Sequence, residues 1–451
     1  MFRKQFMPVP LSHRLKTTLQ TFSVILMVVF FMVLEGQTAV SAPTDITYIP
    51  DQAFGESGFV YPSLQSFYQH STTILQTAGN QLIAVDTHQI SGQSRFGLTQ
   101  YSADGVLDSN FGNAGIASED LGTNDHALAG AIQPDGKIIV VGSSFNVATM
   151  LYHIQMMRFL PDGSLDLNFG TNGIVRKEMT GCTGATAVTL QSDEKILVAG
   201  CTSDANIVLL RYLPDGTIDN SFGVSGMATT RIGDLSKVVA ILLQDDGSIV
   251  LAGRTNLLFR TFLVGYTGDG GLDNSFGNAG IVNLQLTSQD RIETAVLQED
   301  GKIVLAGMGF PNGIDPAGIL LARFNIDGTL DNTFGSTGSV LTDLHSAMGS
   351  GGTAVIQQSD GKLLVAGWTL SSHQSFITLL RYNSDGSLDT SLGHIGNGPI
   401  EMGEYVHGAT DIMILPDEKI VLAGTREEQT YVAQLAPITI ISRIYMPIGA
   451  R

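Results

Sequence analysis

A five-residue signature recurs seven times along the chain, and this repetition limits the possible folds more than any other feature. The signature is Asp-x-x-Phe-Gly, with Leu392 replacing Phe in the last copy, and its copies are 53 to 58 residues apart. Repeats of this length are typical of solenoids, arrays and propellers. The copies are Asp51–Gly55, Asp108–Gly112, Asp166–Gly170, Asp219–Gly223, Asp273–Gly277, Asp331–Gly335 and Asp389–Gly393.

A second signature places a polar turn before an apolar run that ends in Gly. Asp-Gly in most copies suits the positive φ angles of two-residue hairpins. The continuous apolar run predicts a strand covered on both faces. The copies are Asp135–Gly142, Asp193–Gly200, Asp246–Gly253, Asp300–Gly307, Asp360–Gly367 and Asp417–Gly424, with a degenerate first copy at Asn80–Asp86.

One unit predicts a four-stranded antiparallel meander, which is a propeller blade. In the third copy we expect strands at Ala187–Gln191, Lys195–Gly200, Ile207–Tyr212 and Thr217–Asp219. The recurring Phe is expected to be a wedge between blades. The Gly behind it is expected to take a backbone angle that other residues resist.

The two ends of the repeat region complement each other. Ile49–Gly55 is a fourth-strand fragment without a third strand, and Tyr431–Leu435 is a third strand without a following hairpin. Pairing them would complete one blade and leave no open sheet edge. We therefore predict an all-β, seven-bladed β-propeller of four-stranded antiparallel blades, closed by the N-terminal strand.

The repeat units resemble those of the exported bacterial delta-60 repeat family. The resemblance rests on stretches such as Gln358–Gly367 and Arg381–Gly393, and it covers about residues 50–435. It implies a β-propeller-like fold on secreted or surface proteins with no assigned biochemical activity. Leu392 for Phe, and Gly265 and Gln434 where other copies have Arg, depart from the pattern.

The segments outside the repeats predict export. Residues 1–42 combine a basic stretch, the apolar run Phe22–Leu34 and the small residues up to Ala42, as in a signal peptide. The alternative is a retained short anchor, although the run is shorter than the ~20 residues that span a bilayer. We expect the propeller at 43–436. The apolar tail at 437–451 is expected to be an extra edge strand or a sorting segment.

The charge of the chain limits its partners. The total is −18, and residues 1–42 contribute +3, so the remainder carries −21. Such a surface repels phosphate backbones, so no nucleic acid partner is expected. We also expect no membrane span after processing, no cofactor and a monomer.

Cys182 and Cys201 are the two cysteines, and a disulfide between them suits an exported protein. Both flank one predicted hairpin, although its register sets Cys201 opposite position 186, four residues from Cys182. Two inert thiols are the alternative. No His lies nearby and no C-x-x-C spacing occurs, so the pair does not predict a metal site.

Calcium is the sharpest chemical possibility. Asn325–Asp331 and Asn383–Asp389 resemble the alternating oxygen ligands of a calcium loop. Arg323 and Arg381, however, stand where the first carboxylate ligand would be. We therefore expect an Asp-Gly hairpin with each Arg paired to an Asp, and no metal.

The two faces of the predicted ring differ in variety. In a meander, alternate connections share a face, so the uniform Asp-Gly turns lie on one face and the dissimilar loops, including 254–261, 308–318 and 368–375, on the other. Binding usually evolves on such loops. The candidate ligand-binding residues are Arg254, Arg260, Phe310 and Trp368, although packing at the rim is the alternative for Trp368.

The sequence predicts an exported, non-enzymatic scaffold that binds an extracellular glycan, polymer or protein. It contains no G-x-S-x-G, H-E-x-x-H or P-loop motif and nominates no catalytic residue. One alternative is an extracellular polysaccharide hydrolase or lyase on a propeller scaffold. The other is a structural envelope protein.

Overall fold

The computed structural model describes most of the repeat region. It covers residues 44–61, 73–120, 124–146, 151–179, 184–202, 206–233, 235–313, 317–345, 348–371, 375–392, 399–400, 406–426 and 429–441. The predicted signal peptide and residues 442–451 of the predicted tail lie outside this part of the chain. Residues 45–440 form one compact unit.

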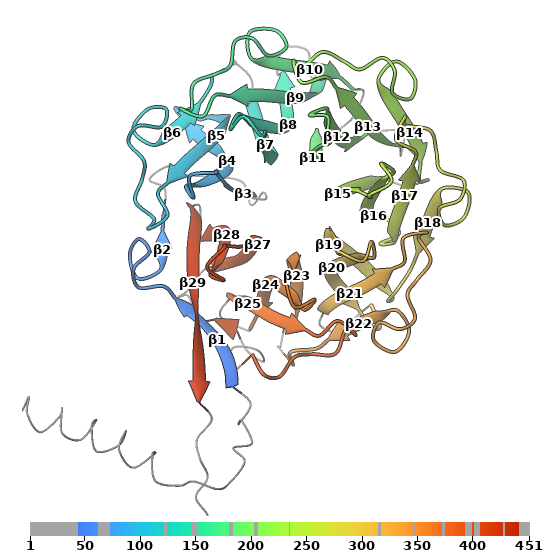
Figure 1. The fold of residues 1–451 in the computed structure, drawn as a ribbon. Coiled ribbons are helices and arrows are strands. Elements are labelled where there is room, and N and C mark those ends of the chain that lie inside the picture. Colours follow the sequence, from blue (N-terminus) through green and yellow to red (C-terminus); the bar gives the residue numbers. More distant parts are fainter. Residues whose placement is uncertain are drawn as a thin grey trace, which may run out of the picture. The chain divides into compact units, whose positions relative to one another are not determined.

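Seven antiparallel sheets stand around a ring, which confirms the predicted seven-bladed β-propeller (Figure 1). The first strand of each blade is the innermost. Blade 1 contains β3 (Thr73–Gln76), β4 (Leu82–Ile90), β5 (Gln93–Tyr101) and β6 (Ile116–Ser118); blade 2 contains β7 (Asn124–Ile132), β8 (Ile138–Asn146), β9 (Leu151–Phe159) and β10 (Ile174–Glu178); blade 3 contains β11 (Ala185–Leu190), β12 (Ile196–Cys201), β13 (Asn206–Tyr212) and β14 (Met227–Arg231).

The remaining blades follow the same order except the last. Blade 4 contains β15 (Ser236–Leu243), β16 (Ile249–Thr255), β17 (Thr261–Tyr266) and β18 (Ile281–Leu284); blade 5 contains β19 (Gln289–Leu297), β20 (Ile303–Phe310), β21 (Gly318–Phe324) and β22 (Ser339–Thr342); blade 6 contains β23 (Ser350–Gln357), β24 (Leu363–Leu370), β25 (Ser375–Tyr382) and β26 (Pro399–Ile400); blade 7 contains β27 (Val406–Ile414), β28 (Ile420–Arg426), β29 (Gln429–Ile441), β1 (Thr44–Pro50) and β2 (Phe59–Val60).

The fourth strand of each blade is not where the sequence predicts it. In blade 3 the predicted strand Thr217–Asp219 makes only one bridge, between Tyr212 and Ile218. The fourth strand is β14, which follows the Phe-Gly pair and pairs with β13. The reason is that Asp-x-x-Phe-Gly is itself a turn, in which the Phe222 N–H donates to the Asp219 carbonyl (3.1 Å).

The N-terminal segment closes the ring, as predicted, but with a different register. β2 pairs with β29 at Phe59↔Ala433 and Val60↔Val432. The Asp51 N–H donates to the Gln434 carbonyl (2.8 Å). In the same way, the N–H of the equivalent Asp219 donates to the Arg211 carbonyl. β1 also joins β29. In blade 7, β29 and β1 therefore stand where the other six blades have an Asp-Gly hairpin, and residues 437–441 of the predicted tail continue β29.

Each Phe of the repeat is a wedge between blades, as predicted. Phe169 is fully buried, and its ring lies against Gly216, in the hairpin of the next blade. A Cβ on that glycine would meet the ring at 2.8 Å, and its φ is +86°. The N–H of Gly170, next to Phe169, donates to the Asp215 carbonyl of the same hairpin (2.8 Å). The same arrangement recurs at six of the seven junctions.

The innermost strands of blades 2 to 7 share a β-bulge near one end. A bulge leaves one residue unpaired and re-aims its side chain. In β19 the register shifts between Ile292 and Thr294, so Glu293 is the bulged residue. This shift positions the charged group described below.

Candidate functional site

The two faces of the ring carry different connections. We call the face with the Asp-Gly hairpins and the Asp-x-x-Phe-Gly turns the turn face; in blade 3 it holds residues 191–195 and 213–226. The opposite face, which we call the loop face, holds residues 256–260 and 285–288 of blade 4 and their equivalents. This parity confirms the prediction that both Asp-Gly turns share a face.

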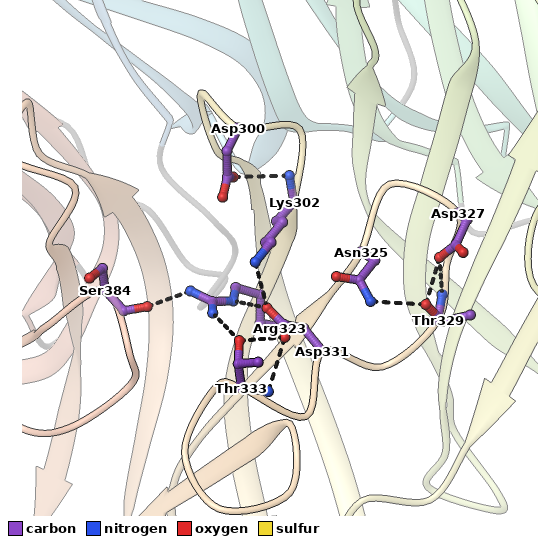
Figure 2. A network of polar contacts seen from close by, with 9 residues as sticks. All are labelled: Asp300, Lys302, Arg323, Asn325, Asp327, Thr329, Asp331, Thr333 and Ser384. Carbon is purple, nitrogen blue, oxygen red and sulfur yellow. Dashed lines mark hydrogen bonds and ion pairs between the residues drawn. The ribbon is translucent and has the colours of Figure 1, made fainter.

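An ion-pair network holds the turn face together (Figure 2). Asp331 Oδ2 accepts hydrogen bonds from Arg323 Nε (2.8 Å) and Lys302 Nζ (2.9 Å), while its Oδ1 caps the N–H of Thr333 (3.0 Å). Arg323 Nη1 also donates to the carbonyl of Ser384 in the next blade. The network therefore joins neighbouring blades.

The same network recurs in blades 2, 3, 5 and 6. In blade 3, a hydrogen bond from Ser221 and the charge of Arg211 lower the pKa of Asp219 to about 2, against the effect of burial. The Arg211 guanidinium also lies over the Phe222 ring, 4.5 Å from its centroid. These groups satisfy one another, so the turn face is a structural surface.

The calcium-like motif is part of this network. Arg323 pairs with Asp331, as predicted, and Asp327 Oδ1 accepts from the N–H (2.9 Å) and hydroxyl (2.6 Å) of Thr329. The carboxylate oxygens thus act as turn caps. Within the described residues, no group of three or more His, Cys, Asp or Glu side chains could hold a metal ion.

On the loop face, three of the four candidate residues lie in strands rather than in loops. Arg254 is in β16, Phe310 ends β20 and Trp368 is in β24. Arg260 alone lies in a connection, where its N–H donates to Thr255 Oγ1 (3.0 Å). Arg254, Phe310 and Trp368 belong to blades 4, 5 and 6, so the structure does not bring all four into one group.

Arg254 belongs to a cluster of charges between blades 4 and 5. Its Nη1 lies 2.5 Å from Glu293 Oε1 and donates to the Ile292 carbonyl (2.7 Å). Arg291 Nε lies 3.0 Å from the same Glu293 oxygen, and Lys237 Nζ lies 3.5 Å from Oε2. We call Lys237, Arg254, Arg291 and Glu293 the cationic cluster.

The members of the cluster differ in exposure. The side chain of Arg254 is only 9% exposed, whereas those of Lys237 and Arg291 are 42% and 51% exposed. Burial among the surrounding residues, with the positive charge of Arg254, lowers the pKa of Lys237. Burial would raise the pKa of Glu293, but the charges of Lys237 and Arg254 lower it. Two cations therefore face solvent around one ionised carboxylate.

Sequence reasoning found Arg254 but missed Lys237, Arg291 and Glu293. Lys237 is the cross-strand partner of Arg254, and Arg291 occupies the equivalent position in the next blade, opposite Met308. Aligning the innermost strands on the second signature would have placed Lys237 and Arg291 at equivalent positions. The glycine that ends the second signature marks the bulge, because a Cβ on Gly307 would meet the Arg291 carbonyl, but the sequence does not show that the bulge turns Glu293 toward Arg254.

Trp368 packs against backbone. Its indole lies over Gly351 of its own blade, where an added Cβ would meet the ring at 3.1 Å, and its Cβ lies against Gly408 of blade 7. The side chain remains partly exposed. Trp368 therefore packs at the rim and still leaves part of its aromatic surface open.

Cys201 ends β12 and is partly buried, and Cys182 lies outside the described residues. The predicted register across this hairpin is wrong by two residues, because Leu190 pairs with Ile196 rather than with Leu197, and the bulge between Ala185 and Ala187 adds a second shift of one. With Ala185 opposite Gly200, Cys201 comes level with position 184 instead of 186. Position 184 is two residues from Cys182 in the sequence, and the disulfide stays a prediction.

One row of side chains in blade 2 has the residue types of a serine-hydrolase triad. Asp125, Ser144 and His153 lie opposite one another across β7, β8 and β9, and such cross-strand partners share a face of the sheet. The Ser144 side chain is only 1% exposed and Asp125 is fully buried. A nucleophile must reach its substrate, so this row does not support hydrolysis.

Comparison with solved structures shows the fold. Among 346 matching chains, hydrazine synthase of Kuenenia stuttgartiensis is 13% identical, with a TM-score of 0.50, covering 84% of this chain and 97% of its own. A family PL25 ulvan lyase bound to -[GlcA(1-4)Rha3S]- is 8% identical, with a TM-score of 0.49 and coverages of 82% and 94%. At these identities the likeness shows the fold alone, and a fold alone does not assign a function.

Sequence comparison gives a match to one family model and no match among curated proteins. In the described part of the chain, no helix is long and apolar enough to cross a membrane. The matching model is the "Domain of unknown function (DUF5122) beta-propeller", at residues 82–111, 133–169, 191–222, 298–334 and 358–392. Each matched segment ends on the Phe, or on Leu392, of the repeat signature. With seven sheets in a ring and this match in five of them, the chain is a β-propeller repeat protein.

Proposed function

We propose that the protein is an exported, non-enzymatic scaffold that binds an extracellular glycan, polymer or protein through its loop face. One observation carries this proposal. At the position that follows the second signature in each blade, the strand toward the loop face carries side chains of different chemistry; those of blades 3, 5 and 6 are partly exposed, and the others are buried. In blade order, the residues at this position are Thr87, Ser143, Cys201, Arg254, Met308, Trp368 and Thr425.

The turn face supports the same proposal by contrast. Its Arg–Asp ion pair repeats in four blades, and in three of them the Arg also lies over the Phe ring, so these groups are satisfied within the protein. A surface of repeated, mutually paired groups offers a ligand little to recognise. Selective binding therefore favours the loop face, where rigid strand ends hold dissimilar side chains.

Export rests on the sequence of residues 1–42 alone. A basic stretch, an apolar run and a small-residue end form a signal-peptide pattern. N-terminal sequencing of the protein recovered from its native compartment tests this part of the proposal. An intact N-terminus would indicate a retained anchor instead.

A binding array of glycans and cell-wall polymers tests the choice of face. Trp368→Ala and Arg254→Ala each remove a loop-face side chain, and only variants that melt like the wild type are compared. Asp360→Asn is the matched control, since Asp360 is an exposed cap of a turn-face hairpin (3.1 Å to the Lys362 nitrogen). We expect both loop-face variants to lose binding and the control to keep it. Equal loss in the control would show that the turn face binds.

A further inference from the structure

We infer that the cationic cluster binds the carboxylate or sulfate group of an acidic sugar, an inference that rests on the proposed function. Lys237, Arg254 and Arg291 carry three positive charges around the single carboxylate of Glu293. The cluster is thus positive by two charges, in a chain whose total is −18. Like charges this close repel one another unless an anion joins them.

Glu293 shows which chemistry the cluster accepts. Its two carboxylate oxygens lie 2.5 Å from Arg254 Nη1, 3.0 Å from Arg291 Nε and 3.5 Å from Lys237 Nζ. Arg291 uses its Nε for this contact. Among the described residues, no partner is found for the two terminal nitrogens of its guanidinium, which is half exposed. A planar guanidinium edge and a neighbouring ammonium suit a second oxyanion.

The surroundings suit a sugar ring. Connection 256–260 lies beside the cluster, because the Asp290 N–H donates to the Phe259 carbonyl (2.9 Å) and the Asn256 N–H donates to the Leu235 carbonyl (2.7 Å). Leu257 and Leu258 are exposed in this connection. The C–H faces of a pyranose can cover such side chains while its acidic group reaches the cations.

The lowered pKa of Lys237 agrees with this geometry. Burial and the neighbouring arginines disfavour its ammonium form, and a bound anion would offset both effects. Lys237 and Arg291 occupy equivalent positions on adjacent innermost strands, next to the bulges.

Calorimetric titration of the full-length protein with oligogalacturonate and with a sulfated oligosaccharide tests the inference. Methyl-esterified oligogalacturonate keeps the rings and removes the charge. We expect Arg291→Gln and Lys237→Gln each to weaken binding of an acidic oligosaccharide about ten-fold, as for a lost charge-assisted hydrogen bond. Lys177→Gln, which removes an exposed charge from the outer strand β10, should have no effect. High salt should weaken wild-type binding and reduce the difference between variants.

Several outcomes would overturn the inference. Equal binding of the methyl ester, unchanged binding by both variants, or no binding of either acidic oligosaccharide would each do so. Polyglutamate binding as tightly as the sugars would show that an acidic peptide fits the cluster instead. If a neutral glycan binds the loop face and Arg291→Gln leaves its affinity unchanged, the proposed function stands and the anion site does not. If no polymer or protein binds, both fail.

Discussion

Tyr48 and Leu392 exchange the roles that glycine and phenylalanine have at the other six blade junctions. Tyr48 stands three residues before Asp51, where the other copies have the hairpin glycine, and Leu392 replaces the wedge Phe. Both side chains are buried in one cluster between blades 6 and 7. Because β29 and β1 replace the hairpin in blade 7, β1 supplies the aromatic ring, which explains the departure at Leu392.

A double-mutant cycle tests this exchange. Tyr48→Gly should cost about 3 kcal/mol or more of unfolding free energy, because it opens a cavity. Leu392→Phe should cost about 1–3 kcal/mol by overpacking. The double variant restores the pair found elsewhere, so its cost, measured by denaturant unfolding, should be smaller than the sum of the two.

Phe334→Leu is the matched control for that cycle. Phe334 lies against Gly386, which occupies the position equivalent to Tyr48. Leucine should therefore destabilise this junction, although it is the native residue at the equivalent position 392. Additive costs in the double variant would mean that Tyr48 and Leu392 do not share a site.

The turn-face network should make stability sensitive to acid. The pKa of Asp219 is lowered to about 2 by Ser221 and Arg211, against about 3.9 in an unfolded chain. A lowered folded-state pKa gives stability that is present above pH 4 and is lost as the pH falls toward 2. For a side chain this buried, the loss is about 2 kcal/mol.

Asp219→Asn should remove that dependence. Its unfolding free energy should be lower than that of the wild type above pH 4, and the two curves should converge as the pH falls toward 2. Asp245→Asn, which removes an exposed carboxylate from hairpin 244–248 on the same face, is the control. Parallel curves for wild type and Asp219→Asn would contradict the assignment.

The sequence predicts the ring because its turns repeat. Asp-Gly hairpins, apolar second strands and wedge phenylalanines are local signals, and each forms as predicted. The fourth strand was misplaced because Asp-x-x-Phe-Gly looks like a strand end. It is in fact a turn, with Gly223 at φ +52° and Gly226 at +86°, and the short strand β14 comes after it.

The cationic cluster could be predicted only in part. Arg254 is visible as a charge at a variable position, but its burial depends on Glu293, which is 39 residues away and in another blade. Neither residue alone indicates the pair. The glycine that ends the second signature leaves room for this bulge, but the pairing of Glu293 with Arg254 joins two blades, and a one-dimensional pattern does not contain it.

The predicted disulfide remains testable. Mass spectrometry of the exported protein without reduction should find Cys182 joined to Cys201. Cys201→Ser should then lower the unfolding free energy by about 3 kcal/mol, as expected for a loop of this size in the chain-entropy model. Alkylation of both thiols before reduction would show that no disulfide forms.

Asp411 should give the junction between the last and first blades its own pH dependence. It lies on β27, at the position where the other bulged strands have alanine or threonine. Its Oδ2 accepts the N–H of Ile74 in β3 (2.8 Å), and its Oδ1 accepts the N–H of Ile412 (2.8 Å). Burial nevertheless raises the pKa of Asp411 to about 6.

The pKa of Asp411 in the folded protein lies above the value of about 3.9 for an unfolded chain. The contribution of Asp411 to the unfolding free energy is therefore fully present below pH 4 and is lost as the pH rises through 6. The loss is about 2–3 kcal/mol between pH 4 and 7. Asp411→Asn does not ionise, so its unfolding free energy should lack this fall, and the gap between the two proteins should change by that amount. Denaturant unfolding across this range, with Asp360→Asn as control, measures it. A constant gap would show that Asp411 is ionised throughout and that its two backbone hydrogen bonds outweigh burial.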